Sequence, residues 1–589
     1  MTTSSTGGVA TNLGSVTEAS GASGTPATSL VVAIVGSGGD GVALMGTLLL
    51  KLAARQGLFG MMVQSYGPQI RGGESAVVLR FATEEVQYEG DQADLVLCFR
   101  LADLKRFQGA VQLHAQSTLI IDTADEGEVP EWLGSSDRPP FRYPFARIEN
   151  GLEVKGEPKN MLGLGLLCRA LGWQPEPVHE EMTKRFAKHP ESLDANRAAF
   201  NHAYGCPELP VLPRLTVEAA PRWIETGNEA VARGAMEAGL RFFAGYPITP
   251  SSEIMETLIR ELPAVGGSLV QAEDEIAAIG MVIGASFGGV PSMTATSGPG
   301  LSLMTEMMGL SSMAEIPVVI VDCQRAGPAT GMPSRTEQSD LYHAIYAGHG
   351  DFPRVVLGVF DVVHAREIMH RAFFLSETYQ MPVLVMSDAY IAQRKQIRPP
   401  IVPREAKTER MLWQAEGPAR FDLSGEHGVS PFRVPGSAGT YLAAGIEHTP
   451  DGSPTADTAI HQQMNEKRFM KLEAVARDAR DWYRLMGRPD APHGLVAWGS
   501  QFGILREWVA RHPEFRVFLP EIIHPFPLAA FESWRQGLTS TTVIELSFQG
   551  QFHRYLSSLT DLGGVRSIAR SGGIPLTMTE LTRLLKETK

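Results

Sequence analysis

Short apolar runs alternate with longer stretches of helical apolar spacing along most of this chain. Leu30–Val35, Pro317–Asp322 and Pro382–Met386 are nearly continuous apolar runs, as is typical of strands buried on both faces of a sheet. Ala365–Glu377 has the spacing of an amphipathic helix, and Gly227–Gly239 has the same spacing, with Asn228 as its predicted N-cap. The alternation predicts an α/β protein with parallel, doubly wound sheets.

Breaks in this pattern divide the chain. The first 28 residues are mostly Ser, Thr, Gly and Ala, too poor in large apolar side chains to form a core, and are predicted to be disordered. A Pro-rich stretch, Pro207–Pro221, reads as a linker. Residues 401–485 are polar and end in a charged helical segment, Glu466–Arg484; a loop of this length suggests a connection that wraps its neighbours. The predicted units are 1–28, 29–212, 213–400, 401–485 and 486–589.

Composition narrows the class of protein. With 589 residues, 52 basic and 65 acidic side chains, the net charge of −13 disfavours nonspecific binding of nucleic acid or anionic membranes. The four cysteines are far apart and show no metal-binding spacing, which favours a reducing compartment and disfavours a resident zinc or iron–sulfur site. No apolar run is long enough to cross a membrane, and no basic leader precedes Lys51. We therefore expect a cytoplasmic protein.

Four motifs in the middle of the chain carry the candidate chemistry. They place turn-forming or acidic residues where a predicted strand gives way to a helix, the sheet edge at which open α/β folds bind ligands. Thr249 and Ser251 offer hydroxyl groups beside two prolines, while Glu273 and Glu275 precede a run of small residues. The motifs are Gly245-Tyr-Pro-Ile-Thr-Pro-Ser-Ser-Glu253, Gln271-Ala-Glu-Asp-Glu-Ile-Ala-Ala-Ile-Gly280, Thr296-Ser-Gly-Pro-Gly300 and Gln324-Arg-Ala-Gly-Pro-Ala-Thr-Gly331.

A further glycine-rich turn, Gly36-Ser-Gly-Gly-Asp-Gly41, follows the first apolar run and opens a predicted helix. This order satisfies a dinucleotide-binding fingerprint. The next predicted strand, however, ends in Gln64, where a ribose-binding acid would be wanted. A tight turn that needs glycine for close packing is the favoured interpretation, and an anion or coenzyme contact is the alternative.

The central motifs resemble the pyrimidine-binding domain of thiamine diphosphate enzymes. Tyr-Pro-Ile-Thr-Pro and Gln-Arg-Ala-Gly-Pro resemble, more narrowly, the alpha subunit of 2-oxoacid:ferredoxin oxidoreductases. The region of Gly36–Gly41 and Ser65–Ser75 is similar to the gamma subunit of the same enzymes, and the last hundred residues are similar to their transketolase C-terminal-like domain. One departure is Glu545-Leu-Ser, where relatives usually have Glu-x-Asn, so any contact made by that Asn is in doubt.

The resemblance implies roles for individual residues. Glu275 best matches the carboxylate that faces the aminopyrimidine ring, with Glu273 as the other candidate; outside this context both would be acids favoured by the helix dipole. Thr249 is expected to donate a hydrogen bond to the 2-oxo acid or cofactor, and Arg325 to pair with the C1 carboxylate. The remaining implied residues are Tyr246, Pro247, Ile248 and Gly298 for the cofactor, and Arg71 and Gly38 for coenzyme A, although a solvated or structural Arg71 is favoured.

The same resemblance implies partners. The Gly-Asp-Gly motif that normally binds the magnesium diphosphate occurs only at Gly39–Gly41, without the following Asn, so this chain is expected to hold no metal and to supply half a thiamine site. A beta subunit would bring Mg²⁺ with the diphosphate and a [4Fe-4S] cluster, in an (alpha–beta)₂ assembly that reduces ferredoxin.

The implied reaction is oxidative decarboxylation of a 2-oxo acid with coenzyme A. Fusion of gamma and alpha parts favours 2-oxoglutarate, with pyruvate or branched-chain 2-oxo acids as the alternative. Arg335, His343 and Arg354 are the candidate partners of a second substrate carboxylate, and the sequence does not choose among them. A hypothesis of another class is an NAD- or nucleotide-binding regulatory protein built on Gly36–Gly41, against which Gln64 argues.

Overall fold

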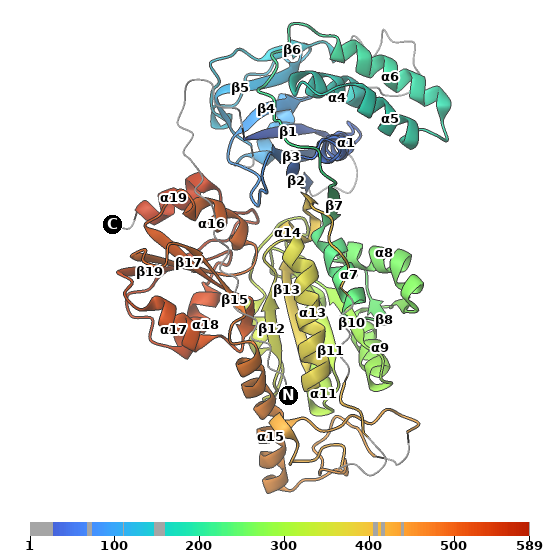
Figure 1. Ribbon diagram of the computed structural model, residues 1–589, viewed down its shortest axis with the longest axis vertical. Coiled ribbons are helices and arrows are strands. Elements are labelled where there is room, and N and C mark those ends of the chain that lie inside the picture. Colours follow the sequence, from blue (N-terminus) through green and yellow to red (C-terminus); the bar gives the residue numbers. More distant parts are fainter. Residues whose placement is uncertain are drawn as a thin grey trace.

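The computed structural model describes residues 28–66, 74–109, 111–145, 159–404, 410–413, 419–437 and 441–587. Within them the strands form sheets of eight, seven and five strands, separated in space as Figure 1 shows. The predicted α/β class is confirmed. The predicted disordered segment lies outside the described residues except for Thr28. No helix in these ranges is long and apolar enough to cross a membrane.

The N-terminal domain, residues 28–222, is built on the eight-stranded sheet. Its centre is β1 (Ser29–Ser37), which lies antiparallel to β3 (Glu74–Ala82) and parallel to β4 (Ala93–Cys98). Its other strands are β2 (Phe59–Tyr66), β5 (Leu113–Asp122) and β6 (Phe141–Tyr143), and its longer helices are α1 (Val42–Arg55), α4 (Lys159–Ala170), α5 (Glu176–Arg185) and α6 (Pro190–Tyr204).

The central domain, residues 223–398, also contributes to that first sheet. Its first strand β7 (Trp223–Thr226) and last strand β14 (Lys395–Arg398) pair with each other, and β14 pairs with β2. Arg398 is buried there and forms an ion pair with Glu225. The two domains are therefore joined by a continuous backbone ladder as well as by the linker.

The seven-stranded sheet lies between the helices of the central domain. It has the order β18-β12-β13-β11-β10-β8-β9 and is parallel except for β18. The strands are β8 (Phe242–Gly245), β9 (Ser268–Gln271), β10 (Ser292–Thr296), β11 (Val318–Gln324), β12 (Val355–Gly358), β13 (Pro382–Asp388) and β18 (Ile522–His524); the helices are α7 (Gly227–Glu237), α8 (Ser252–Glu261), α9 (Glu275–Phe287), α10 (Gly298–Leu303), α11 (Thr305–Met313), α12 (Leu341–Tyr346), α13 (Val362–Tyr379) and α14 (Ala389–Gln393).

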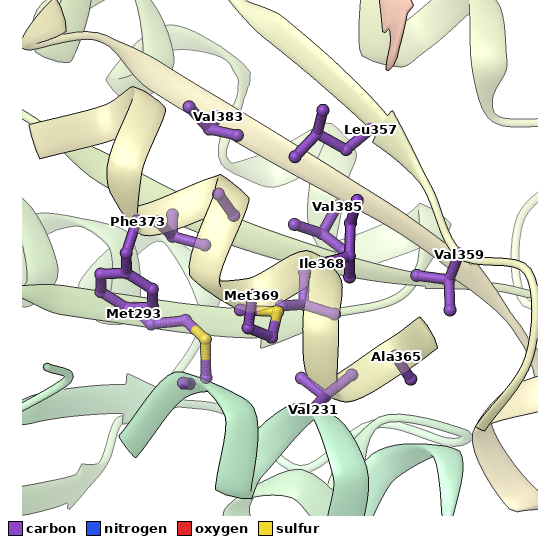
Figure 2. Packing of buried hydrophobic residues seen from close by; sticks show 14 of the residues in the cluster. Val231, Met293, Leu357, Val359, Ala365, Ile368, Met369, Phe373, Val383 and Val385 are labelled. Atoms are coloured by element: carbon purple, nitrogen blue, oxygen red, sulfur yellow. The ribbon is translucent and has the colours of Figure 1, made fainter. Parts of the chain in front are cut away.

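Helix α13 lies in the middle of this domain's largest core. Figure 2 shows its side chains Ile368, Met369 and Phe373 packed among Val383 and Val385 of β13. The predicted helix is present, but most of its residues are buried, and α7 packs closely along it. Gly234 of α7 permits this contact: a Cβ there would lie 2.3 Å from the Arg366 carbonyl oxygen.

Two local predictions in and after this domain are wrong. Thr226, rather than Asn228, caps α7: its hydroxyl accepts from the Glu229 N–H, and the Glu229 carboxylate accepts from the Thr226 N–H. Asn228 lies inside the helix and donates to the Pro250 carbonyl, because it is buried against the loop after β8. The charged helix is α15 (Thr458–Asp478), and Arg484 belongs to a strand instead.

The C-terminal domain, residues 479–587, packs beside the central sheet. Its β18 pairs with β12, so its backbone extends the sheet of the central domain. Its own sheet has the order β15-β17-β16-β19-β20. The elements are β15 (Tyr483–Gly487), β16 (His493–Ala497), β17 (Phe515–Pro520), β19 (Ser540–Glu545), β20 (Arg566–Ala569), α16 (Gln501–Val509), α17 (Leu528–Arg535), α18 (Gln551–Leu559) and α19 (Met578–Lys586).

Candidate active site

The loop after β8 and the turn after β10 flank a reversal of strand order in the central sheet. From β8 the chain passes outward to β9 and then returns to β10 on the other side of β8. Loops at the carboxyl ends of β8 and β10 must therefore diverge, which leaves the crevice where doubly wound sheets bind ligands. These segments carry Thr249 and Gly298, two of the predicted site residues.

Glu275 and Glu273, which sequence reasoning left as alternatives, have different environments. Glu275 is the first residue of α9 and is only 5% exposed, whereas Glu273 is exposed. The carboxylate of Asp274 caps the helix by accepting from the Ala277 N–H at 2.7 Å. Capping does not use Glu275, so its carboxylate is free to meet a ligand and Glu275 becomes the stronger candidate.

The turn after β10 is shaped around the Glu275 side chain. A Cβ built on Gly300 would lie 2.5 Å from Glu275 Oε1 and 2.0 Å from Thr296 Oγ1. Glycine at this position is therefore required for the carboxylate to lie against the turn. The Ser297 hydroxyl, fully buried on the same turn, has no hydrogen-bond partner within the described residues.

Replacing Gly300 with alanine should displace Glu275. We expect Gly300→Ala to lower the turnover of the complex with its beta subunit by about tenfold or more, because misplacing a reacting group by about 1 Å can cost 10²-fold. Gly205→Ala is the control, since its Cβ would make only an ordinary 3.4 Å contact. Equal activities of the two variants and the wild type would show that Glu275 does not need this turn.

Arg325 and Thr249 lie side by side and contact each other through the backbone of Thr249. Arg325 Nη1 donates to the Thr249 carbonyl oxygen at 2.5 Å, and the Thr249 side chain is exposed. Arg325 itself is 7% exposed, and burial lowers the pKa of its guanidinium while nearby Asp340 opposes that shift. Tyr246 on the same loop is exposed. The loop after β8 thus carries an exposed hydroxyl and an exposed phenol ring, and its backbone is bonded by the buried Arg325 cation.

The segment that follows Arg325 is held by the C-terminal domain, which sequence reasoning missed. Gln338 bonds that domain through its backbone N–H and its side-chain amide. Its N–H donates to the Leu546 carbonyl, its side-chain oxygen accepts from the Leu546 N–H, and its side-chain NH₂ donates to the Trp498 carbonyl. Glu337 accepts from Gly572 N–H. No local pattern marks these contacts, because their partners lie more than 150 residues away in sequence.

Asp322 and Asp340 were also not singled out as site residues. Asp322 lies in β11 in register with Thr296 of β10, and its side chain is fully buried. Asp340 precedes α12 and lies against Gly298, where a Cβ would be 2.7 Å from Asp340 Oδ2. Glu275 and Asp340 therefore approach the same turn at two different glycines.

Two backbone donors of the turn at Gly36–Gly41, the N–H groups of Ser37 and Asp40, bond within the turn itself. The Asp40 carboxylate accepts from the Ser37 N–H at 2.7 Å and pairs with Lys159 at 3.3 Å. An acid at this position repels a phosphate group, which argues against the nucleotide-binding hypothesis and supports a structural turn. Gly38 is exposed, and Arg71 lies outside the described residues.

Ser547 takes a local role at the position where relatives have Asn. Its hydroxyl donates to Glu545 Oε2 and accepts from Gly550 N–H, while the Glu545 carboxylate accepts from Phe552 and His553 N–H. Burial raises the pKa of Glu545, and these donors oppose that shift. The departure in sequence therefore leaves an ordered cap at the start of α18.

Family models match two parts of the chain. Residues 31–206 match the pyruvate ferredoxin/flavodoxin oxidoreductase domain, and residues 233–467 match the thiamine-diphosphate-binding domain of pyruvate flavodoxin/ferredoxin oxidoreductases. The second match includes every central motif and the connecting segment as far as residue 467. The resemblance seen in the sequence is therefore confirmed by two independent regions.

Curated and solved relatives agree with these matches. The chain is 32% identical over 454 residues to the alpha subunit of 2-oxoacid:ferredoxin oxidoreductase 1 from Sulfurisphaera tokodaii, covering 74% of this chain and 72% of that one. It is 43% identical to subunit KorA of 2-oxoglutarate synthase from Methanothermobacter thermautotrophicus, over 59% of this chain and 93% of that one. A structure of 2-oxoglutarate:ferredoxin oxidoreductase from Magnetococcus marinus superposes with a TM-score of 0.88 at 32% identity, covering 95% and 99% of the two chains. The chain therefore belongs to the 2-oxoacid:ferredoxin oxidoreductases.

Proposed function

We propose that this chain is the gamma-fused alpha subunit of an enzyme that converts 2-oxoglutarate, coenzyme A and oxidised ferredoxin reversibly to succinyl-CoA, CO₂ and reduced ferredoxin. The observation that carries the proposal is the placement of Glu275 against the turn after β10 and of Arg325 against the Thr249 loop, both at the carboxyl edge of the central sheet. The structure of the Magnetococcus marinus enzyme with 2-oxoglutarate, coenzyme A and succinyl-CoA bound supports this choice of substrates.

The residues at the crevice fit thiamine diphosphate. Three features would suit a polar heterocycle. The Glu275 carboxylate is buried, the turn leaves no room for a side chain at Gly300, and the buried Ser297 hydroxyl has no hydrogen-bond partner among the described residues. When bound, this cofactor supplies the electron sink for decarboxylation of the 2-oxo acid. Glu275 would hold and return a proton at the ring nitrogen, with Tyr246, Pro247, Ile248 and Gly298 around it. Arg325 would bind the C1 carboxylate, and the Thr249 hydroxyl would donate a hydrogen bond to the substrate.

The rest of the site is proposed to come from a beta subunit. Because this chain lacks the paired Gly-Asp-Gly and Asn motif and has only four dispersed cysteines, the Mg²⁺-diphosphate half and the [4Fe-4S] cluster are assigned to the partner. Relatives named as alpha subunits support a multi-subunit enzyme. We propose an (alpha–beta)₂ assembly in the cytoplasm that passes electrons to ferredoxin and uses coenzyme A as co-substrate.

Position favours Arg335 among the candidates for the distal carboxylate of 2-oxoglutarate. Arg354 precedes β12, at the opposite end of the parallel strands from the crevice, and lies over the Phe352 ring. His343 is bonded to Thr305. Arg335 shares a loop with Arg325, since its carbonyl accepts from Ala326 N–H. Its guanidinium is half-buried without a hydrogen-bond or ion-pair partner in the described part of the chain, and burial lowers its pKa.

The test is a substrate profile of the purified complex with its beta subunit, measured as reduction of a low-potential one-electron dye. We expect turnover with 2-oxoglutarate, and we expect Arg335→Gln to raise its KM by about tenfold or more while the KM of any pyruvate reaction stays unchanged, as for loss of one charge-assisted contact. Turnover of pyruvate without 2-oxoglutarate would overturn the substrate assignment. Equal effects on both substrates would remove Arg335 from the distal site.

A further inference from the structure

We propose that a turn of the C-terminal domain, at Gly572 and Gly573, positions the Arg335 side chain and thereby favours 2-oxo acids that carry a second carboxylate. Gly573 is the positioning residue, because it acts on the substrate only through Arg335. The inference rests on the proposed function, which gives Arg335 its substrate carboxylate. It assigns a part in substrate selection to a domain that supplies none of the residues assigned above to the cofactor or the substrate.

The backbone of Arg335 is fixed to the loop that begins at Arg325. Its N–H donates to the Met332 carbonyl at 3.0 Å, and its carbonyl accepts from the Ala326 N–H at 2.9 Å. Ala326 and Met332 also form a β-bridge with each other. Because both backbone polar groups of Arg335 are bonded, the start of its side chain has a defined place beside the residue that follows Arg325.

The C-terminal turn contacts the same loop directly after Arg335. The Thr336 N–H donates to the Gly573 carbonyl at 3.2 Å, and the Glu337 carboxylate accepts from the Gly572 N–H at 2.9 Å. The C-terminal domain therefore holds the two residues that follow Arg335, while the loop itself holds Arg335.

The Arg335 side chain packs directly on Gly573. A Cβ built on Gly573 would lie 2.8 Å from Arg335 Cβ and 3.2 Å from Arg335 Cγ. The Met332 Cε would be 2.9 Å away, but this end of a flexible side chain can move, whereas a Cβ cannot move without its backbone. Glycine at position 573 therefore gives the first carbons of the Arg335 side chain room to lie against the turn.

The turn is braced within its own domain by Arg570. The Arg570 guanidinium donates to the carbonyl groups of Ile574 and Pro575, which follow the turn, and pairs with Glu580 of α19 at 2.9 Å. Hydrogen bonds from a charged donor are stronger than those between neutral groups. The surface on which Arg335 packs is therefore anchored to α19 and does not depend on a bound substrate.

This support matters because the end of the Arg335 side chain is unpaired. Its guanidinium has no hydrogen-bond or ion-pair partner in the part of the chain that the structure describes. A free arginine side chain loses rotamer freedom when it binds a carboxylate. Confining its first carbons before binding reduces that loss, which lowers the KM of a 2-oxo acid with a second carboxylate.

The test compares Gly573→Ala with Gly564→Ala in the complex with its beta subunit, with KM and kcat measured for 2-oxoglutarate. The two glycines have φ of +74° and +77°, so alanine strains the backbone equally, but a Cβ on Gly564 meets nothing within 4 Å. We expect Gly573→Ala to raise KM about three- to tenfold with kcat nearly unchanged, as for one side chain that must be immobilised on binding. Gly564→Ala should keep the wild-type KM. An equal rise in both variants would assign the effect to backbone strain and overturn the inference.

A double variant separates an effect through Arg335 from a general one. Arg335→Gln removes the charge that the turn positions, so adding Gly573→Ala to it should raise KM no further. If Gly573→Ala raised KM as much in Arg335→Gln as in the wild type, the turn would act on the site by another route, which contradicts the inference.

A measurement without turnover separates this inference from the proposed function. The Thr336 amide, which donates to the Gly573 carbonyl, should exchange its hydrogen about tenfold faster in the full-length Gly573→Ala chain than in Gly564→Ala, as for loss of one hydrogen bond. Equal exchange would remove the contact on which the inference rests, whatever the kinetics show. If exchange differs as expected but the wild-type complex turns over no 2-oxoglutarate, the proposed function fails, and the part of the turn in substrate selection is overturned with it.

Discussion

Glu275→Gln is expected to reduce dye-coupled turnover of 2-oxoglutarate by the complex at least about 100-fold, which is the lower range of general acid–base contributions. Glutamine has the size of glutamate, so the buried space beside Gly300 stays filled, but it cannot exchange a proton at the position of Oε1. The fall should appear in kcat, because binding of the 2-oxo acid is assigned to Arg325 and Thr249. Steady-state kinetics and the bound thiamine content of the purified complex measure both effects.

Glu273→Gln is the matched control for this result. Glu273 lies two residues earlier and carries the same charge, but its side chain is exposed. It should therefore keep nearly wild-type turnover. If Glu273→Gln lost activity and Glu275→Gln did not, the assignment of the cofactor-facing acid would be reversed.

Glu315→Gln is expected to destabilise the packing of α15 by about 3–5 kcal/mol, as found when one partner of a buried ion pair is removed. Glu315 is fully buried and bonds Lys467 and Lys471 at 2.6 to 2.7 Å, while Arg420 donates to its carbonyl. The variant would leave two buried ammonium groups without a carboxylate. Hydrogen exchange of the α15 amides in the isolated chain measures the free energy of opening.

The pH dependence of this effect has a definite sign. Burial alone would raise the pKa of Glu315, but Lys467, Lys471 and Arg420 together lower it below its ordinary value. The stabilisation that the ionised Glu315 carboxylate contributes is therefore complete above an unfolded-state pKa of about 4.3 and is lost on acidification below it.

Arg480→Ala is the control for the Glu315 variant. Arg480 forms an exposed pair with Asp481, so its loss should change the opening free energy by less than about 0.5 kcal/mol. A similarly small effect of Glu315→Gln would show that the connecting segment is anchored by other contacts.

Several parts of the site followed from the sequence because their signals are local. Pro restricts the backbone and Gly permits tight turns within a few residues, so the loop of Thr249 and the turn of Gly298 were predictable where apolar runs end. The strands around them were predictable for the same reason, since buried runs such as those ending at Asp322 and Met386 need no knowledge of their neighbours. The wrong N-cap prediction at Asn228 shows where local signals are insufficient. Both Thr226 and Asn228 lie near the start of α7 and could cap it, but the Asn228 side chain instead donates a hydrogen bond to the distant Pro250 carbonyl.

The amino-acid sequence by itself determined the α/β class, the family resemblance and the residue types that carry the chemistry. Only the tertiary structure decided which of them act together. It buried Glu275 against Gly300 and left Glu273 exposed, placed Arg354 at the far end of the strands, and set Asp340 against Gly298. These placements depend on the strand order and on the hydrogen bonds by which the C-terminal domain holds Gln338. Because such contacts join residues that are distant along the chain, they produce no periodic or local pattern in the sequence.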